Sequence, residues 1–241
     1  MSDDEHSDND NSGADTHGRR FFGRRKGHQL KRHQGELMET LLPQLAVDLA
    51  TPAPKDFAAL FGAEHTENLW LEIGFGGGEH LAAHALARPH TGFIGCEPFL
   101  NGMAKALALV ETHALKNVRL HFGDAMDLLR WLPDASLAGV DLLYPDPWPK
   151  VRHWKRRFVQ DDSIAEIARV LKPGTVFRVA TDIPHYAAWT LERVLRNPDF
   201  IWTAQCADDW RLSWSGWTQT RYEAKALREG RTPAYFIFQR R

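Results

Sequence analysis

The sequence predicts an α/β domain in which a mostly parallel sheet carries helices on both faces. From Asn68 onward, short apolar segments alternate with longer amphipathic ones, which is the pattern of strands followed by helices. Acidic residues end five of the short segments, and the carboxyl ends of parallel strands meet at one edge of a sheet. The chain has 241 residues, which is enough to bury one large core.

The predicted strands and helices follow one another in a regular order. Five strands are predicted at residues 69–73, 91–97, 118–124, 140–146 and 175–182. Amphipathic helices are predicted between and after them, at residues 81–87, 102–115, 125–132, 163–171 and 186–195. Two further β-like segments, 200–205 and 234–239, bring the expected sheet to seven strands. Pro173 and Gly174 predict a turn that ends a helix before the fifth strand.

The N-terminal part of the chain separates its charges. Residues 1–18 contain six acids and no Lys or Arg, whereas residues 19–32 contain seven cations and no acid. We expect a disordered acidic tail at 1–18 and a basic N-terminal arm at 19–34, which either contacts nucleic acid or is a solvated tail. Residues 35–241 are expected to form a single domain. This domain begins with a helical pattern broken at Pro43 and a Pro-rich linker at 51–56.

Composition excludes several classes of protein. No apolar run approaches the roughly 20 residues of a membrane span, and no secretory signal is visible. Cys96 and Cys206 lie far apart, which favours two reduced thiols in a cytoplasmic protein. Despite the 12 His we expect no metal, because no CxxC pattern appears. A monomer and a homodimer are both compatible with these features.

A glycine-rich turn follows the first predicted strand. Gly74, Gly76 and Gly78 allow positive φ and a close approach of a ligand to the backbone. The spacing is not the dinucleotide fingerprint, because Glu79 occupies the position of the third glycine. An acid at that helix N-terminus would oppose a pyrophosphate. The turn therefore argues against NAD or FAD and favours a nucleoside cofactor without phosphates.

Carboxylates stand at the ends of the five predicted strands: Glu72, Glu97, Asp124, Asp146 and Asp182. Each one alone is more often a helix cap than a ligand, but five together favour a functional site. Glu97 lies about 20 residues beyond the glycine turn, where a carboxylate can accept two ribose hydroxyls. Asp124 is placed to accept the exocyclic amine of an adenine.

Residues 141–157 bring an acid, an aromatic ring and a cationic run together. Three prolines fix the backbone around Asp146 and Trp148, and five of the eight residues 150–157 are Lys or Arg. A rigid acid and a ring suit a planar base, and the cations suit phosphates. The simpler interpretation is a Pro-rich turn that leads into a solvated charged face. The adjacency of all three favours a nucleic-acid-modifying site.

Six segments together resemble the bacterial tRNA (guanine-N7)-methyltransferase family: LEIGFGGGEHL, GCEP, GDA, YPDPWPKVRHWKRR, ATD and TRYE. The resemblance runs from about Arg20 to the C-terminus, and the PDPW element with its basic continuation is its most specific part. It implies a Rossmann-like class I S-adenosylmethionine-dependent fold with a seven-stranded sheet. It also implies methyl transfer from S-adenosylmethionine to N7 of guanine 46 in the variable loop of tRNA.

The resemblance also implies roles for individual residues. Glu72, Glu97, Asp124 and Asp146 would bind S-adenosylmethionine beside Gly74, Gly76 and Gly78, and Asp146 would be catalytic. Contacts with the tRNA substrate would come from Lys150, Asp182, Thr220, Arg221, Tyr222 and Glu223. For phosphate contacts we expect Arg152, Lys155, Arg156 and Arg157, with Arg24, Arg25 and Lys26 as a second, more flexible group.

Two residues depart from the family pattern. Val151 stands where a basic residue is expected, and Trp154 stands where His is expected, so that stacking could replace charge there. Three tryptophans at 210, 214 and 217 are spaced by four and three, which predicts one helical face packed on the core.

The alternative functions are a methyltransferase for another nucleobase or a protein, and a non-catalytic RNA-binding relative. A NAD-dependent oxidoreductase is disfavoured by the glycine spacing.

Overall fold

The computed structural model describes residues 25–61 and 68–241. The predicted acidic tail and residues 19–24 of the predicted arm lie outside the described residues. Within the described ranges, no helix has the length and apolar character needed to cross a membrane. Both cysteines are free thiols, Cys96 in the interior and Cys206 at the surface.

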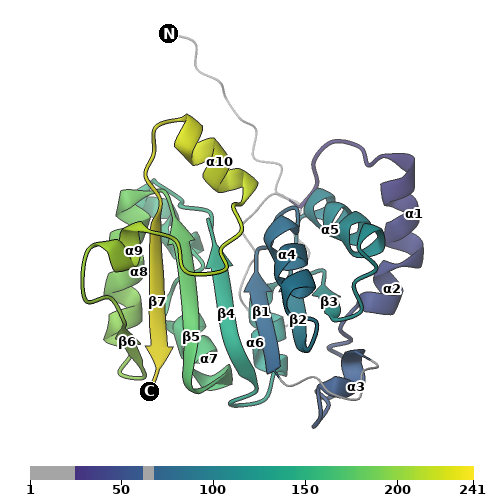
Figure 1. Cartoon of the computed structure of the whole chain (residues 1–241), viewed down its shortest axis with the longest axis horizontal. Coiled ribbons are helices and arrows are strands. Elements are labelled where there is room, and N and C mark those ends of the chain that lie inside the picture. Colours follow the sequence, from purple (N-terminus) through teal and green to yellow (C-terminus); the bar gives the residue numbers. More distant parts are fainter. Residues whose placement is uncertain (1–24, 62–67) are drawn as a thin grey trace.

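A seven-stranded sheet forms the centre of the molecule, in the order β3-β2-β1-β4-β5-β7-β6 (Figure 1). The first five strands pair in parallel, and β7 runs antiparallel to both β5 and β6. The predicted mostly parallel seven-stranded sheet is therefore confirmed. The strands are β1 (Asn68–Ile73), β2 (Thr91–Cys96), β3 (Val118–His121), β4 (Leu137–Leu143), β5 (Leu171–Thr181), β6 (Phe200–Trp202) and β7 (Ala234–Arg240).

Helices cover both faces of the sheet (Figure 1), and the apolar side chains form a separate cluster on each face. One face carries α1 (Arg32–Thr40), α4 (Glu79–Ala87) and α5 (Leu100–Thr112), and the other carries α6 (Ala125–Trp131), α7 (Asp161–Val170) and α8 (Pro184–Arg196). The shorter helices are α2 (Leu42–Leu45), α3 (Ala58–Phe61), η1 (Val151–Arg156), α9 (Asp208–Arg211) and α10 (Arg221–Arg228). Because sequential strands spread outward from β1 and β4, the chain changes direction between these two strands. A crevice at such a point is the usual ligand site of an open α/β sheet.

The described part of the basic arm is attached to α5. The amide of Leu100 donates to the carbonyl of Arg25 at 2.9 Å. The Asn101 side chain accepts from the amide of Gly27 and donates to the carbonyl of His28, both at 2.7 Å. Residues 32–34, which the sequence assigns to the arm, form the first turn of α1. The arm therefore lies against the start of α5, which begins three residues after Glu97.

The turn predicted at Pro173 and Gly174 occurs inside β5 instead of before it. Leu137 pairs with Leu171, but the next pair joins Gly139 to Val176, so the register shifts between them. Gly174 has a φ of 80°, and proline lacks the N–H that a regular ladder needs. The two residues form an irregularity in the strand.

The helical face predicted for the three tryptophans is wrong. The helix α9 ends at Arg211, so Trp214 and Trp217 lie in the loop that follows. Their rings pack edge-on against Tyr235, at centroid distances of 6.0 and 5.3 Å. Gly216 in this loop has a φ of 77°, which is a turn conformation. Tertiary packing places these half-buried rings against the apolar cluster of Leu143, Ala180 and Tyr235, without any helical periodicity.

Candidate active site

The glycine turn after β1 needs its glycines. Gly74, Gly76 and Gly78 have φ values of 69°, 60° and 81°, which lie in the region that other residues avoid. Gly78 is the N-cap of α4. A Cβ on this residue would lie 2.7 Å from the Cβ of Ala106 in α5. The positive φ allowed by the three glycines is therefore confirmed, and the end of the turn at Gly78 packs closely against α5.

Glu97 follows β2 and its carboxylate reaches back to the glycine turn. One oxygen accepts from the amide of Gly76 at 2.7 Å, and the other accepts from the amide of Phe99 at 2.9 Å. Burial raises the pKa of Glu97, while these two backbone hydrogen bonds oppose the rise. Each oxygen keeps a second lone pair. The carboxylate can therefore accept two more hydroxyl groups at the edge of the sheet.

Asp124 follows β3 and is the N-cap of α6. Its Oδ1 accepts from the amide of Met126 at 2.8 Å. The cap explains why an acid stands here, and it engages only one of the two carboxylate oxygens. The other oxygen retains its acceptor capacity.

Asp146 lies in a loop with an unusual backbone. Tyr144 and Trp148, on either side of it, have φ values of 50° and 41°. Among the described residues, only Ala114 and Ala135 share this conformation without being glycine. The Asp146 side chain is exposed, yet the surrounding protein displaces enough water to raise the pKa of its carboxyl group. The loop therefore presents a carboxylate that is partly desolvated.

The basic run after this loop forms η1, and Lys150 is its N-cap. Lys150, Arg152 and Lys155 are exposed, as the expected contact with a polyanion requires. Arg156 is half-buried, and its guanidinium lies over the Trp148 ring at 5.1 Å. Val151 is 70% exposed, so an apolar side chain stands at the surface where the family pattern has a basic one.

Arg157 lies in the interior and is only 1% exposed. Its Nε donates to the carbonyl of Pro147 at 2.9 Å, and its guanidinium lies 4.9 Å from the Trp154 ring. This position does not fit the phosphate contact expected for Arg157, because a phosphate would have no access to the side chain. Trp154 is likewise half-buried against Arg157 instead of projecting outward.

The four residues 220–223 divide into two pairs. Thr220 is the N-cap of α10, and its Oγ1 accepts from the amide of Glu223 at 3.1 Å. The buried carboxylate of Glu223 accepts from Trp217 Nε1 at 2.7 Å and from the hydroxyl of Tyr235. Thr220 and Glu223 therefore anchor the start of α10 to the body of the domain.

Arg221 and Tyr222 point the other way, toward the glycine turn. A Cβ on Gly76 would lie 3.1 Å from the Tyr222 ring and 3.4 Å from the Arg221 guanidinium. The charge of Arg221 also acts to lower the pKa of Glu97. The helix lies beyond the edge of the sheet, at the top of Figure 1. Two residues expected at the tRNA contact thus lie directly beside the glycine turn.

Asp182 follows β5 and is half-buried. One of its carboxylate oxygens accepts from Nε of Arg231 at 2.5 Å. Its position after β5 brings it to the same edge of the sheet as Asp146 after β4, because these two strands are parallel neighbours. A substrate at Asp182 would therefore meet an acid that is already paired with an arginine.

Glu72 has a partner that sequence reasoning did not identify. Its carboxylate lies 2.8 Å from Nδ1 of His80, and both side chains are buried. Burial raises the pKa of Glu72. Burial lowers the pKa of His80, but the Glu72 carboxylate outweighs this effect and the net direction is upward. Glu72 thus faces α4, and its expected contact with a cofactor stays a prediction.

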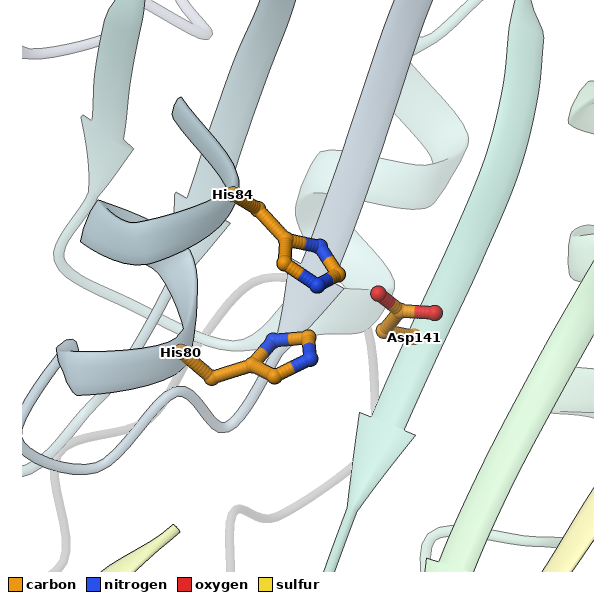
Figure 2. Close-up of side chains that lie close together, drawn as sticks. All are labelled: His80, His84 and Asp141. Carbon is orange, nitrogen blue, oxygen red and sulfur yellow. The ribbon is translucent and has the colours of Figure 1, made fainter. Parts of the chain in front are cut away.

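His80, His84 and Asp141 form a second unanticipated group. Figure 2 shows both rings pointing from α4 toward the Asp141 carboxylate on β4, and their candidate ligand atoms lie within 4.8 Å of one another. Asp141 is fully buried and accepts two hydrogen bonds from Arg178, both at 2.6 Å. His84 Nδ1 lies 2.7 Å from Nη2 of Arg88, and because arginine only donates, this nitrogen accepts.

The contacts of this group favour an ion-pair network over a metal centre. Burial lowers the pKa of His84 to about 3, and the nearby His80 adds to the effect. The Arg178 guanidinium is stacked between the rings of Trp70 at 4.6 Å and Trp214 at 4.5 Å. A metal cation would have to displace a bidentate arginine from Asp141. His80 and His84 are four residues apart, an HxxxH spacing that could have signalled this pair, but no local pattern relates them to Asp141 or Arg178.

Comparisons with known proteins agree with this geometry. A family model described as "Putative methyltransferase" matches residues 66–235. The chain is 58% identical, over 215 residues, to a tRNA (guanine-N(7)-)-methyltransferase of Nitrobacter hamburgensis. This match covers 89% of the chain and 84% of the relative.

Solved structures with a similar fold have little sequence in common with this chain. The 16S rRNA methyltransferase KamB has a TM-score of 0.52 at 16% identity, over 79% of this chain and 94% of its own. A mutant of the 16S rRNA (adenine(1408)-N(1))-methyltransferase from Catenulisporales acidiphilia, solved with its cosubstrate SAM, has a TM-score of 0.50 at 16% identity, over 79% and 92%. These likenesses concern the fold, which is Rossmann-like and of the class I methyltransferase type.

Proposed function

This chain belongs to the tRNA (guanine-N(7)-)-methyltransferase family, and we infer from this membership that it methylates N7 of guanine in tRNA with S-adenosylmethionine as methyl donor. The observation that carries the inference is the identity of 58% with a relative of that name, over most of both chains. Two structural features, the glycine turn and the Glu97 carboxylate, also support the inference.

We propose guanine 46, in the variable loop, as the modified position. The resemblance of residues 144–157 to the most specific element of the family supports this assignment. The exposed cations of η1 follow Asp146 within ten residues of the chain and would supply a surface for the phosphates that flank a loop nucleotide.

The residues at the sheet edge fit a nucleoside cofactor. Glu97 has free lone pairs for two ribose hydroxyls, and Asp124 has a free oxygen for an adenine amine. The turn at Gly76 lets the backbone approach the ligand, and Tyr222 and Arg221 lie against its other side. When bound, S-adenosylmethionine supplies a methyl group on a sulfonium centre.

The chemical step requires little proton transfer by residues of the chain. Guanine N7 carries a free lone pair, so no base is needed, and the main task is to hold the guanine in line with the methyl group. Methylation leaves the purine cationic, and a fixed carboxylate stabilises such a developing charge. We assign this role to Asp146, with Asp182 orienting the guanine edge. Lys150, Arg152 and Lys155 would hold the tRNA backbone.

Incubation of the full chain with labelled S-adenosylmethionine and unmodified tRNA tests the proposed function. Mass analysis of the nucleosides should find 7-methylguanosine, and cleavage of the tRNA at that base should map it to position 46. Labelled methyl in another nucleoside would favour the alternative of a different nucleobase. Binding of tRNA without any transfer would favour the non-catalytic alternative.

A further inference from the structure

Arg157 is a buried cation that binds the backbone of the Asp146 loop. Its Nε donates to the carbonyl of Pro147 at 2.9 Å, and Nη2 donates to the carbonyl of Trp148 at 3.3 Å. Nη2 also lies 3.1 Å from Nδ1 of His185, in the first turn of α8. The guanidinium thus joins two successive carbonyls of the loop to a helix of the domain.

Aromatic rings enclose this guanidinium. Its central carbon lies 4.9 Å from the Trp154 ring, 4.8 Å from the Trp189 ring and 5.5 Å from the Tyr186 ring. Burial lowers the pKa of Arg157, but an arginine remains charged under such conditions. A planar guanidinium can stack on rings and donate two diverging hydrogen bonds at once, and a lysine ammonium lacks this shape.

The loop held by Arg157 is strained. Tyr144 and Trp148 both have positive φ, a conformation that is unfavourable for a residue other than glycine. Such conformations persist only where the surroundings enforce them. The carbonyl of Trp148 is one of the two groups that Arg157 binds, so Arg157 directly holds one of the two strained residues.

We propose that Arg157 is a positioning residue that fixes the Asp146 loop for methyl transfer. It acts through the carbonyls of Pro147 and Trp148 and does not touch the tRNA. The role rests on the proposed function, because it assumes that Asp146 acts in the chemical step. It separates Arg157 from its neighbours Arg152 and Lys155, whose exposed side chains are suited to phosphates.

The substitution Arg157→Lys tests this role, because lysine keeps the positive charge but lacks the planar guanidinium that donates two diverging hydrogen bonds. At saturating tRNA and cofactor, the single-turnover rate should fall by about 10²-fold, as expected for a misplacement of the order of 1 Å. The tRNA affinity and its salt dependence should stay within about twofold of the wild type. A salt slope lower by about 0.7–0.9 would instead mark a lost phosphate contact and would overturn the proposal, as would an unchanged rate.

Arg193→Lys is the matched control. Arg193 stacks on the same Trp189 ring, at 4.4 Å, and pairs with Asp161, and among the described residues it forms no hydrogen bond or ion pair with the Asp146 loop. Loss of its guanidinium should leave the methylation rate unchanged. An equal loss of rate in both variants would show that packing around Trp189 is responsible, and would count against Arg157.

A second variant keeps the test decisive if Arg157→Lys does not fold. His185→Ala leaves Arg157 in place and removes the third partner of its guanidinium, so the rate should fall by about threefold to tenfold, the usual effect of one hydrogen bond. The ¹⁹F signal of Trp148 in fluorotryptophan-labelled protein should shift in both variants and stay fixed in Arg193→Lys. This signal needs no turnover. A wild type that forms no 7-methylguanosine would refute the proposed function, whereas an unmoved Trp148 signal would refute the role of Arg157.

Discussion

The loop that carries Asp146 has little backbone freedom. Prolines at 145, 147 and 149 restrict the chain, and the neighbouring Tyr144 and Trp148 adopt positive φ. A carboxylate held in this way needs no reorganisation when positive charge develops on a substrate, which is the condition for efficient electrostatic stabilisation.

Asp146→Ala should lower the single-turnover rate of tRNA methylation by about 10²–10³-fold, because it removes the charge that opposes the developing purine cation. Asp146→Asn keeps the hydrogen bonding without the charge and should retain intermediate activity. Affinity for S-adenosylhomocysteine should remain in both variants. Near-normal rates in both would remove Asp146 from the mechanism and leave the step to Asp182 or to backbone groups.

Glu97→Ala should weaken S-adenosylhomocysteine binding by at least tenfold, since each charge-assisted hydrogen bond contributes about 1.5–3 kcal/mol. The substitution also removes the acceptor for the amides of Gly76 and Phe99. Calorimetric titration measures the affinity. In the wild type, S-adenosylhomocysteine should raise the melting temperature and NAD should not. Unchanged affinity in the variant would mean that the ribose binds elsewhere.

At the scale of elements, η1 has an outer and an inner side. Lys150, Arg152 and Lys155 are exposed, whereas Trp154 and the following Arg157 pack against α8. One short basic segment thus combines a surface suited to RNA with an internal support for the active-site loop. The sequence alone shows only its density of charge.

Neutralising the outer side by Arg152→Gln and Lys155→Gln together should lower tRNA affinity. The slope of log affinity against log salt should flatten by about one to two units, at roughly 0.7–0.9 for each lost phosphate contact. Filter binding at several salt concentrations measures this slope. Arg130→Gln with Lys172→Gln is the control pair, because these residues lie at the ends of α6 and β5 remote from Asp146. Equal slopes in all three proteins would mean that η1 is only a solvated face.

In α10, the capping contacts decide which residues face the site. Thr220 and Glu223 attach the start of the helix to the loop and to β7. This leaves Arg221 and Tyr222 beside the glycine turn. A helix that is anchored on one side can hold two side chains over a ligand pocket on the other.

At the scale of the molecule, a buried charged network ties together elements that are distant in sequence. Asp141 on β4 pairs with Arg178 on β5, and Trp70 on β1 donates to the same carboxylate at 3.0 Å. Trp214 stacks on Arg178 from the loop before α10. Removing one partner of such a pair is strongly destabilising, because a buried charge is left uncompensated. The network therefore connects the glycine-turn helix, the sheet and the loop that supports α10.

The low pKa of His84, about 3, predicts a dependence of stability on pH. Between about pH 6.5 and 3 the unfolded chain binds a proton at this residue and the native state does not. Stability therefore falls as pH falls through this window, by at most about 1.4 kcal/mol per pH unit. His84→Asn lacks the group and should show a shallower slope. Urea unfolding at several pH values measures both, and parallel curves would contradict the assignment.

Much of the architecture was predictable from the sequence. The alternation of apolar and amphipathic segments predicts the five parallel strands and the helices between them. The spacing of apolar residues in a segment reflects which of its faces is buried, and this spacing differs between strands and helices. The glycine turn and the acids at strand ends predict the edge where the site lies, since parallel strands present their carboxyl ends together. The PDPW element supplies the family, which the 58% identity confirms.

Only the tertiary structure decided which side chains face the site and which face the core. Arg157 and Arg152 belong to the same basic run, yet one is enclosed by rings from α8 and the other is exposed. Trp214 and Trp217 pack on β7 without a helix, and Glu72 turns toward His80. Each outcome depends on partners that are distant in the chain, and local sequence patterns carry no information about them. The sequence by itself determined the fold and the family, whereas long-range packing determined which charges are buried, because desolvation depends on all the neighbours that surround a group.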